Sequence, residues 1–343
     1  MDRPHHISLR ELLQSWNLHV KSIEPIKDVY KVRTDQGVKS LKGSPMSTAA
    51  MRFIHSALKH LHSQGFNRVL RAIPTSDGQD FIVAEGLVYS LYDWIDGRRP
   101  DFRKSHELQD AVKTMAAMHQ AGLGFQPPTG ASPRKRWGRL DESHKKHRQD
   151  LADFSDYAKA KRYLSRFDRE FLKHLTDYLQ LADQAIAALN VEEYSQIVQE
   201  AKQKGCICHG DVAERNFVLS PDGVMNLIDL DSCRLDLPVM DLVKLTRRVL
   251  KKVNWDPAVA KTIITAYQEA FPLSEAEIRI FGAVISFPQK FWRIADRYYH
   301  KKKFFSEEKA YNKLRKVTKQ KKGFLGFLAC YNKEAPDWWR SSP

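Results

Sequence analysis

The first part of the chain alternates apolar and polar positions in the manner of β-strands. Residues 29–34 and 38–42 both read as extended segments, and Gly37 lies in the turn between them, which predicts a β-hairpin. Residues 81–84 and 87–92, separated by a Glu-Gly turn, predict a second hairpin. We therefore expect a small β-rich region at the start of the chain.

One helix interrupts these strands. Apolar residues from Met51 to Leu61 recur at helical spacing, and Gly65 is the expected C-cap. We expect the opposite face of this helix, which carries Arg52, His55 and Lys59, to be solvated.

After Asp93 the apolar positions change to the spacing of helices. Residues 111–118 and 171–186 predict two of them. Short strands return at 216–219 and 224–230, on either side of a Pro-Asp-Gly turn. The pattern predicts an α+β fold with two lobes, the small β-rich N-terminal lobe and a larger, mainly helical C-terminal lobe.

We place the boundary of the lobes so that residues 1–93 form the first and residues 94–343 the second. A chain of 343 residues, 42% of them hydrophobic, can build cores of this size. The four cysteines are too few for a disulfide framework, which favours a reducing compartment. No run of 18 apolar residues occurs, so we expect no transmembrane segment.

Charge restricts the partners without identifying them. The 56 Lys and Arg residues exceed the 41 Asp and Glu residues, which gives a formal net charge of +15 at pH 7. This excess favours acidic partners, such as nucleic acid, anionic membranes or acidic proteins. Short basic runs are more often solvated surface than a binding site, so charge alone does not indicate nucleic-acid binding.

The segment with the clearest chemistry begins at His209. Asp211 is followed five residues later by Asn216, and Asp229 lies between apolar residues further along. Magnesium-dependent phosphoryl transfer needs such a set: the first Asp accepts the proton of the attacking hydroxyl, while Asn and the later Asp hold the metal. A hairpin of this length would bring Asn216 and Asp229 together. Ordinary turn chemistry is the alternative, and Asp231 is either a ligand or only a neighbour.

These motifs resemble those of the aminoglycoside phosphotransferase and choline kinase group, which is related to the protein kinases. Further segments are similar to the CotS-type spore coat proteins of spore-forming bacilli, and the resemblance extends from about Val38 to Tyr299. The segments that carry it are Tyr92–Gly97, Met118–Gly122, Asp241–Leu245 and Phe291–Tyr299.

The resemblance implies a bilobal protein kinase-like fold, with ATP and Mg²⁺ as cofactors and an unidentified hydroxyl-bearing substrate. It implies that Asp211 is the catalytic base and that Asn216 and Asp229 are metal ligands. His209 and Asp241 would support the catalytic loop. The resemblance also implies a location in the mother-cell cytoplasm and the spore coat, with spore coat proteins as partners.

Lys42 is the candidate for binding the nucleotide phosphates, because Lys-Ser-Leu-Lys at residues 39–42 fits the Val-Ala-Ile-Lys pattern of kinases. Two departures argue against a complete site. No glycine occurs between Ile23 and Arg33, where a flexible turn would cover the phosphates, and no glutamate occurs between Glu24 and Glu85 to pair with the lysine.

Two interpretations therefore stay open at this stage. The chain is either a phosphotransferase that uses ATP and Mg²⁺, or a catalytically degenerate kinase-fold protein with a structural or binding role in the spore coat. Binding of nucleic acid is the least favoured interpretation, because only charge supports it.

Overall fold

Contacts within the chain group it into two units, and the strands all belong to the first. The first unit comprises Met1–Lys135 and Lys204–Asp236, and the second comprises Arg136–Gln203 and Leu237–Pro343. The fold is α+β, as expected. The division into lobes at residues 93 and 94 stays a prediction. The structure, a computed structural model, describes residues 8–135, 137–300 and 305–339.

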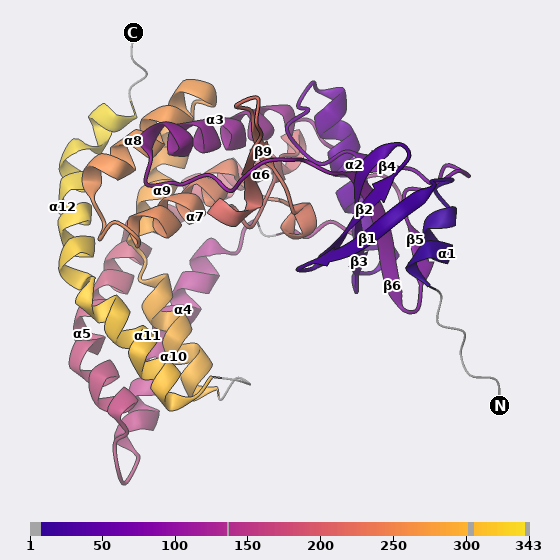
Figure 1. Ribbon diagram of the computed structural model, residues 1–343. Helices are drawn as coiled ribbons and strands as arrows, with labels where there is room; N and C mark the ends of the chain where they lie inside the picture. Colours follow the sequence, from indigo (N-terminus) through magenta and orange to yellow (C-terminus); the bar gives the residue numbers. More distant parts are fainter. Residues whose placement is uncertain (1–7, 136, 301–304, 340–343) are drawn as a thin grey trace. The chain divides into compact units, whose positions relative to one another are not determined.

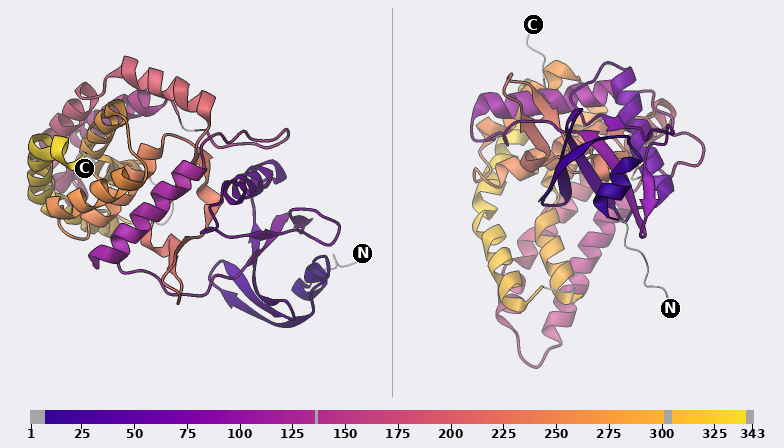
Figure 2. Two further views of the ribbon diagram at one scale, coloured as in Figure 1. Left: turned by 90° about the horizontal axis from the view of Figure 1, so that it is seen from above. Right: turned by 45° about the vertical axis from the view of Figure 1, so that its right-hand side comes forward.

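The described part of the first unit contains a six-stranded antiparallel sheet, seen in indigo and purple in Figure 1 and from two further sides in Figure 2. Both expected hairpins are present in it, joining the second strand to the third and the fifth to the sixth. Hydrogen bonds connect the strands in the order β1-β2-β3-β6-β4, with β5 paired to β6. The strands are β1 (Val20–Ile26), β2 (Val29–Thr34), β3 (Gly37–Ser44), β4 (Ala72–Ile73), β5 (Ile82–Ala84) and β6 (Leu87–Asp93).

One face of this sheet is apolar. Successive residues of a strand point to opposite sides, and Leu41 and Leu91 share a buried cluster with Leu13 and Trp16. The two latter residues come from the short helix α1 (Leu9–Gln14) and the turn after it. Trp16 also donates its indole N–H to the carbonyl oxygen of Ile73 at 2.9 Å, which ties this segment to β4.

The other face carries small and polar side chains and packs against α2 (Thr48–Ser63). His55 of this helix is fully buried, and its Nε2 lies 2.9 Å from Ser90 Oγ and 3.3 Å from Tyr92 Oη. Arg52 and Lys59 are exposed, as expected. The expectation of a solvated His55 was wrong, because the hydroxyl groups of β6 provide the imidazole with buried hydrogen-bond partners.

Backbone hydrogen bonds join the rest of the first unit to the segments on either side of this sheet. Leu227 donates its N–H to the carbonyl oxygen of Arg68 at 2.7 Å, and Leu219 and Arg98 exchange two backbone hydrogen bonds. The hairpin expected around the Pro-Asp-Gly turn is present and is held by backbone contacts. These elements are α3 (Ser105–Ala121), β7 (Ile207–Cys208), η1 (Glu214–Asn216), β8 (Phe217–Leu219), β9 (Met225–Leu227), η2 (Leu230–Ser232) and β10 (Arg234–Leu235).

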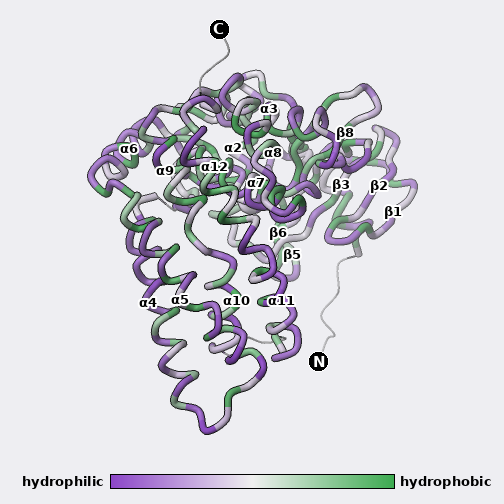
Figure 3. The backbone as a smooth tube through the Cα atoms, turned by 90° about the vertical axis from the view of Figure 1, so that its left-hand side faces the viewer, coloured by the Kyte–Doolittle hydropathy of each residue, from purple (hydrophilic) through white to green (hydrophobic). Residues whose placement is uncertain are grey.

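The second unit is helical over its described residues. Helix α4 packs on α5 and α10, and α11 packs on the same two helices, so the four enclose a common core (Figure 3). Aromatic rings fill part of it, with Tyr178 and Phe291 stacked at 3.9 Å between centroids. The helices are α4 (Leu140–Lys159), α5 (Arg166–Ala187), α6 (Val191–Lys204), α7 (Pro238–Leu250), α8 (Pro257–Ala270), α9 (Glu275–Ser286), α10 (Gln289–Tyr299), α11 (Glu307–Lys319) and α12 (Lys321–Trp338).

None of the helices within the described ranges combines the length and the apolar character that crossing a membrane requires. The described cysteines Cys206, Cys208, Cys233 and Cys330 all carry free thiols.

Burial of His55 predicts an acid-sensitive fold. Burial lowers its pKa from 6.5 to about 4. Between these values the unfolded chain binds a proton that the folded chain does not, so the free energy of unfolding falls as the pH drops from 6.5 towards 4. The expected loss is about 1.4 kcal/mol per pH unit, or roughly 3 kcal/mol in all.

We expect His55→Gln to have a correspondingly shallower pH dependence in this window, measured by urea unfolding at several pH values. The control is His19→Gln, at an exposed position before β1, which should keep the wild-type slope. Equal slopes for His55→Gln and the wild type would contradict the assignment.

Candidate active site

The loop after β7 is organised around a buried imidazole. His209 is fully buried, and the N–H of Asp211 donates to its Nδ1 at 3.3 Å. Its Nε2 lies 3.0 Å from the carbonyl oxygen of Ile228 and donates to it, since the other ring nitrogen is an acceptor. His209 is therefore a neutral imidazole with its proton on Nε2, and it joins the start of the loop to the end of β9.

Gly210 allows the loop to turn at this point. Its φ is +82°, and a Cβ atom at this position would lie 2.2 Å from the carbonyl oxygen of Ser232. Arg234 donates from Nη2 to the carbonyl oxygen of Gly210 at 2.9 Å. The close approach of these segments requires glycine.

Asp211 is held from two sides. Arg215 donates from Nη2 to Asp211 Oδ2 at 2.6 Å. Asn216 donates from Nδ2 to the carbonyl oxygen of Asp211 at 2.8 Å and to its Oδ2 at 3.3 Å. These contacts hold the carboxylate in one orientation while 23% of its side chain stays exposed, so it remains accessible to a substrate.

Asn216 and Asp229 lie at the same end of the β8–β9 hairpin. Phe217 pairs with Leu227, and Ile228 donates its N–H to the carbonyl oxygen of Asn216 at 2.9 Å. Asp229 follows directly, in the left-handed region at φ +65° and ψ 63°. The structure thus brings together the two residues that the sequence proposed as metal ligands.

Lys42 reaches this end of the hairpin from β3. Its Nζ lies 2.7 Å from Asp229 Oδ1 and 2.9 Å from Asp231 Oδ2. Burial lowers the pKa of Lys42, but the two carboxylates outweigh that effect and raise the pKa above its usual value, so the ammonium stays charged. Lys39 points to the other side of the strand and pairs with Asp93 at 2.7 Å.

The chemistry of these donors suits a hard cation. Carboxylates from Asp229 and Asp231 and the side-chain oxygen of Asn216 are the ligand types that Mg²⁺ takes. Since Asn216 uses its NH₂ group on Asp211, its oxygen is the atom available for a metal. Asp231, which the sequence left open, contacts the same ammonium, and its role as a metal ligand stays a prediction.

The first hairpin lacks a flexible cover for phosphates. Strands β1 and β2 pair up to Ile26 and Val29, so only Lys27 and Asp28 form the turn, with Lys27 at φ +53°. A turn this tight, without glycine, has little freedom to bring backbone N–H groups onto a phosphate.

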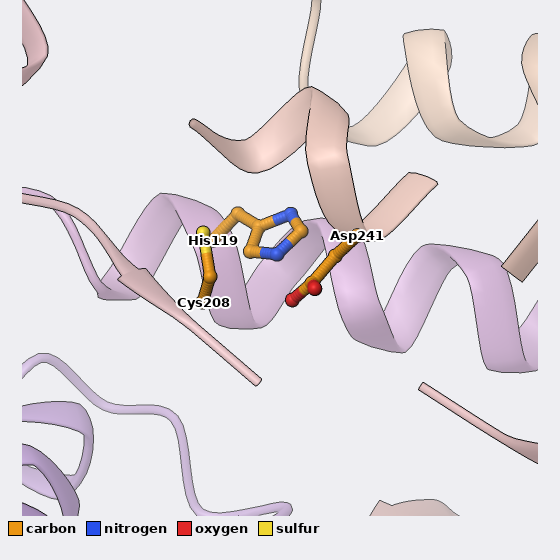
Figure 4. A group of neighbouring side chains, drawn as sticks. All are labelled: His119, Cys208 and Asp241. Atoms are coloured by element: carbon orange, nitrogen blue, oxygen red, sulfur yellow. The ribbon is translucent and has the colours of Figure 1, made fainter. Parts of the chain in front are cut away.

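Two fully buried side chains of the first unit, one from α3 and one from β7, lie close to each other. His119 of α3 and Cys208 of β7 have ligand-type atoms within 4.8 Å of each other (Figure 4). The Cys208 thiol donates to the carbonyl oxygen of Asp236 at 3.3 Å. A thiol and an imidazole supply only two of the four ligands of a structural zinc site, so we interpret the pair as core packing.

Asp241 belongs to the second unit, in the first turn of α7. Its side chain is fully buried, and Lys244 donates to its Oδ1 at 3.0 Å. Its role in supporting the catalytic loop stays a prediction.

Sequence reasoning missed the partners of the loop. The spacing of Asp211 and Arg215, four residues apart, predicts an ion pair only on a helix, and residues 211–213 are not helical, so it was no signal here. The contact of Arg234 with Gly210 left no local signal, because the two residues meet only through the fold.

Solved structures identify the fold. An aminoglycoside phosphotransferase from Alicyclobacillus acidocaldarius matches with a TM-score of 0.85 and 21% identity, covering 98% of each chain. Spectinomycin phosphotransferase in complex with ADP and spectinomycin matches with a TM-score of 0.62 and 14% identity, covering 94% of this chain and 99% of that chain. The fold is therefore that of the kinase-like phosphotransferases.

Sequence comparison identifies the family. The family described as "Spore coat putative kinase YutH" matches residues 9–331, and the chain belongs to that family. Spore coat protein S of Bacillus subtilis (strain 168) is 27% identical over 328 residues, covering 93% of each protein. The expected kinase-like protein of the CotS type is confirmed.

Removal of the Lys42 ammonium should make the melting temperature of the protein respond to Mg²⁺. In Lys42→Met, Asp229 and Asp231 face each other without a cation, which we expect to cost roughly 1 kcal/mol of unfolding free energy, given their partial exposure. Mg²⁺ should restore this loss by taking the place of the ammonium, as measured by melting temperature with and without MgCl₂.

Lys39→Met is the matched control, since Lys39 lies on the same strand and pairs with Asp93. Its melting temperature should not respond selectively to Mg²⁺. An equal response of both variants would show that the effect is general screening by salt.

Proposed function

We propose that the protein is an ATP- and Mg²⁺-dependent phosphotransferase that transfers the γ-phosphoryl group to a hydroxyl group of a substrate in spore coat assembly. The observation that carries the proposal is the distance of 2.7 Å between Lys42 Nζ and Asp229 Oδ1. It brings the candidate phosphate-binding lysine beside the candidate metal ligand.

Each residue has a role that its contacts support. Asp211 accepts the proton of the attacking hydroxyl, and Arg215 and Asn216 keep its carboxylate oriented. Lys42 binds phosphate oxygens and balances their charge. His209 holds the loop through its two hydrogen bonds and takes no part in proton transfer, because both ring nitrogens are occupied.

Asn216 and Asp229, with Asp231 beside them, would hold the metal. Bound Mg²⁺ would neutralise the phosphate oxygens of ATP during transfer. The complexes of spectinomycin phosphotransferase with ADP and with AMP support a nucleotide at this fold.

The likeness to Spore coat protein S supports a place in the spore coat. The net charge of +15 supports an acidic coat protein as the partner or substrate carrier. The hydroxyl acceptor itself is unassigned.

A second candidate function is a kinase-fold structural protein of the spore coat without catalysis. The ion pairs of Lys42 with Asp229 and Asp231 also fit this second function, since Lys42 already satisfies the carboxylates that would hold the metal. The tight turn at Lys27 and the absence of a glutamate partner for Lys42 favour it as well. Nucleotide binding distinguishes the two candidates.

Asp211→Asn should abolish phosphoryl transfer, because an amide cannot accept the proton. We expect a loss of about 10² to 10⁴-fold in kcat with an active acceptor and a melting temperature within a degree or two of wild type. Turnover would be measured as ADP release with ATP and a panel of hydroxyl acceptors, including spore coat extract.

The control for this variant is Asp110→Asn, which makes the same change at an exposed position of α3. It should keep full activity. Unchanged turnover in Asp211→Asn would refute the role of Asp211.

Calorimetric titration with ATP tests the proposal as a whole. We expect wild-type protein to bind ATP weakly and only with Mg²⁺. Asp229→Asn should abolish the Mg²⁺-dependent binding of ATP. The backbone conformation at this position should stay the same, since Asn also adopts the left-handed conformation readily. Absence of ATP binding to the wild type at any Mg²⁺ concentration would favour the structural protein instead.

A further inference from the structure

A cavity in the second unit combines aromatic walls with an excess of positive charge. The space open to the centres of water molecules is about 40 Å³, enough for several waters or a small ion. None of its lining residues belongs to the site described above. The walls include Tyr178, Trp255, Phe324, Arg247, Lys251 and Lys290.

The three cations that line this cavity, Arg247, Lys251 and Lys290, form no ion pair with a carboxylate of the described residues. Burial, and after it the charges of Arg247, Lys290, Arg293 and Arg248, lower the pKa of Lys251 to about 7. Burial, and after it the charge of Arg293, also lower the pKa of Arg247 and of Lys290. Such a group of like charges, partly removed from water, destabilises the fold unless an anion joins it.

Backbone carbonyl oxygens hold one of these cations in place, and another lies at the start of a helix. Arg247 donates from Nη2 to the carbonyl oxygens of Val284 and Phe287, the latter at 2.8 Å. These acceptors are neutral, so they orient the guanidinium without cancelling its charge. Lys290 lies in the first turn of α10, where the helix dipole adds further positive potential.

We propose that this cavity binds an oxyanion of the phosphate class, either a free phosphate ion or the phosphate group of an ester. Arg247, Lys251 and Lys290 provide the charge, and planar guanidinium and ammonium donors are the groups that bind phosphate. Aromatic side chains also line the cavity and would contact an apolar substituent of an ester. The site does not depend on the proposed phosphotransferase activity.

Titration of the full chain with inorganic phosphate tests the proposal. Binding would be followed by tryptophan fluorescence, since Trp255 lines the cavity, and by melting temperature, with NaCl at equal ionic strength as the reference. We expect saturable binding to the wild type and a Kd about tenfold or more higher for Lys251→Met, which loses one charge-assisted hydrogen bond.

Lys251→Met also separates binding from a structural role. Without phosphate its melting temperature should equal or exceed that of the wild type, because an uncompensated charge has been removed. The matched control is Lys261→Met, at an exposed position of α8, which should bind phosphate like the wild type. Asp211→Asn should do so too, which distinguishes this site from the phosphotransfer site.

Phenyl phosphate distinguishes the two sources of the anion. Tighter binding of phenyl phosphate than of inorganic phosphate would identify an ester, and tighter binding of inorganic phosphate would identify the free ion. Equal effects of phosphate and chloride on the wild type, or equal phosphate affinity of Lys251→Met and the wild type, would overturn the proposal. If Lys251→Met does not fold, Lys290→Met takes its place with the same expected loss.

Discussion

One ammonium group between two carboxylates holds together the segments that form the candidate active site. Lys42 Nζ lies 2.7 Å from Asp229 and 2.9 Å from Asp231, so a strand of the sheet is bound to the turn after β9 by charge. The ammonium offsets the repulsion between these two carboxylates. A divalent metal, if it binds here as proposed, would compete with the ammonium for the same oxygens and would leave the lysine free to bind phosphate.

Patterns that depend on neighbours in the sequence predicted much of this architecture. The strands at residues 29–34 and 38–42 were predictable because side chains alternate with a period of two. The hairpin that joins Asn216 to Asp229 was predictable because its turn residues are strong signals. The sequence pattern predicted the helices of the second unit less completely, because α4 is dominated by charged residues and its apolar stripe is weak.

Contacts between distant segments were outside the reach of such patterns. The buried state of His55 depends on Ser90, which lies on another element 35 residues away. Likewise, the partner of Lys42 was sought as a glutamate of the helix, whereas the structure supplies aspartates 187 and 189 residues further along. The cationic cavity is a third example, because its charges come from the end of α7 and the start of α10, and each looks like an ordinary surface residue in sequence.

The left-handed backbone of Asp229 carries a conformational cost that the ion pair with Lys42 sets against a gain. A residue with a Cβ atom at φ +65° costs on the order of 1 kcal/mol relative to glycine, which adopts that conformation without penalty. Exchange for glycine would relieve the strain, yet it would remove a carboxylate. Glycine at this position would leave the Lys42 ammonium paired with Asp231 alone, so the backbone and the ion pair favour different residues here.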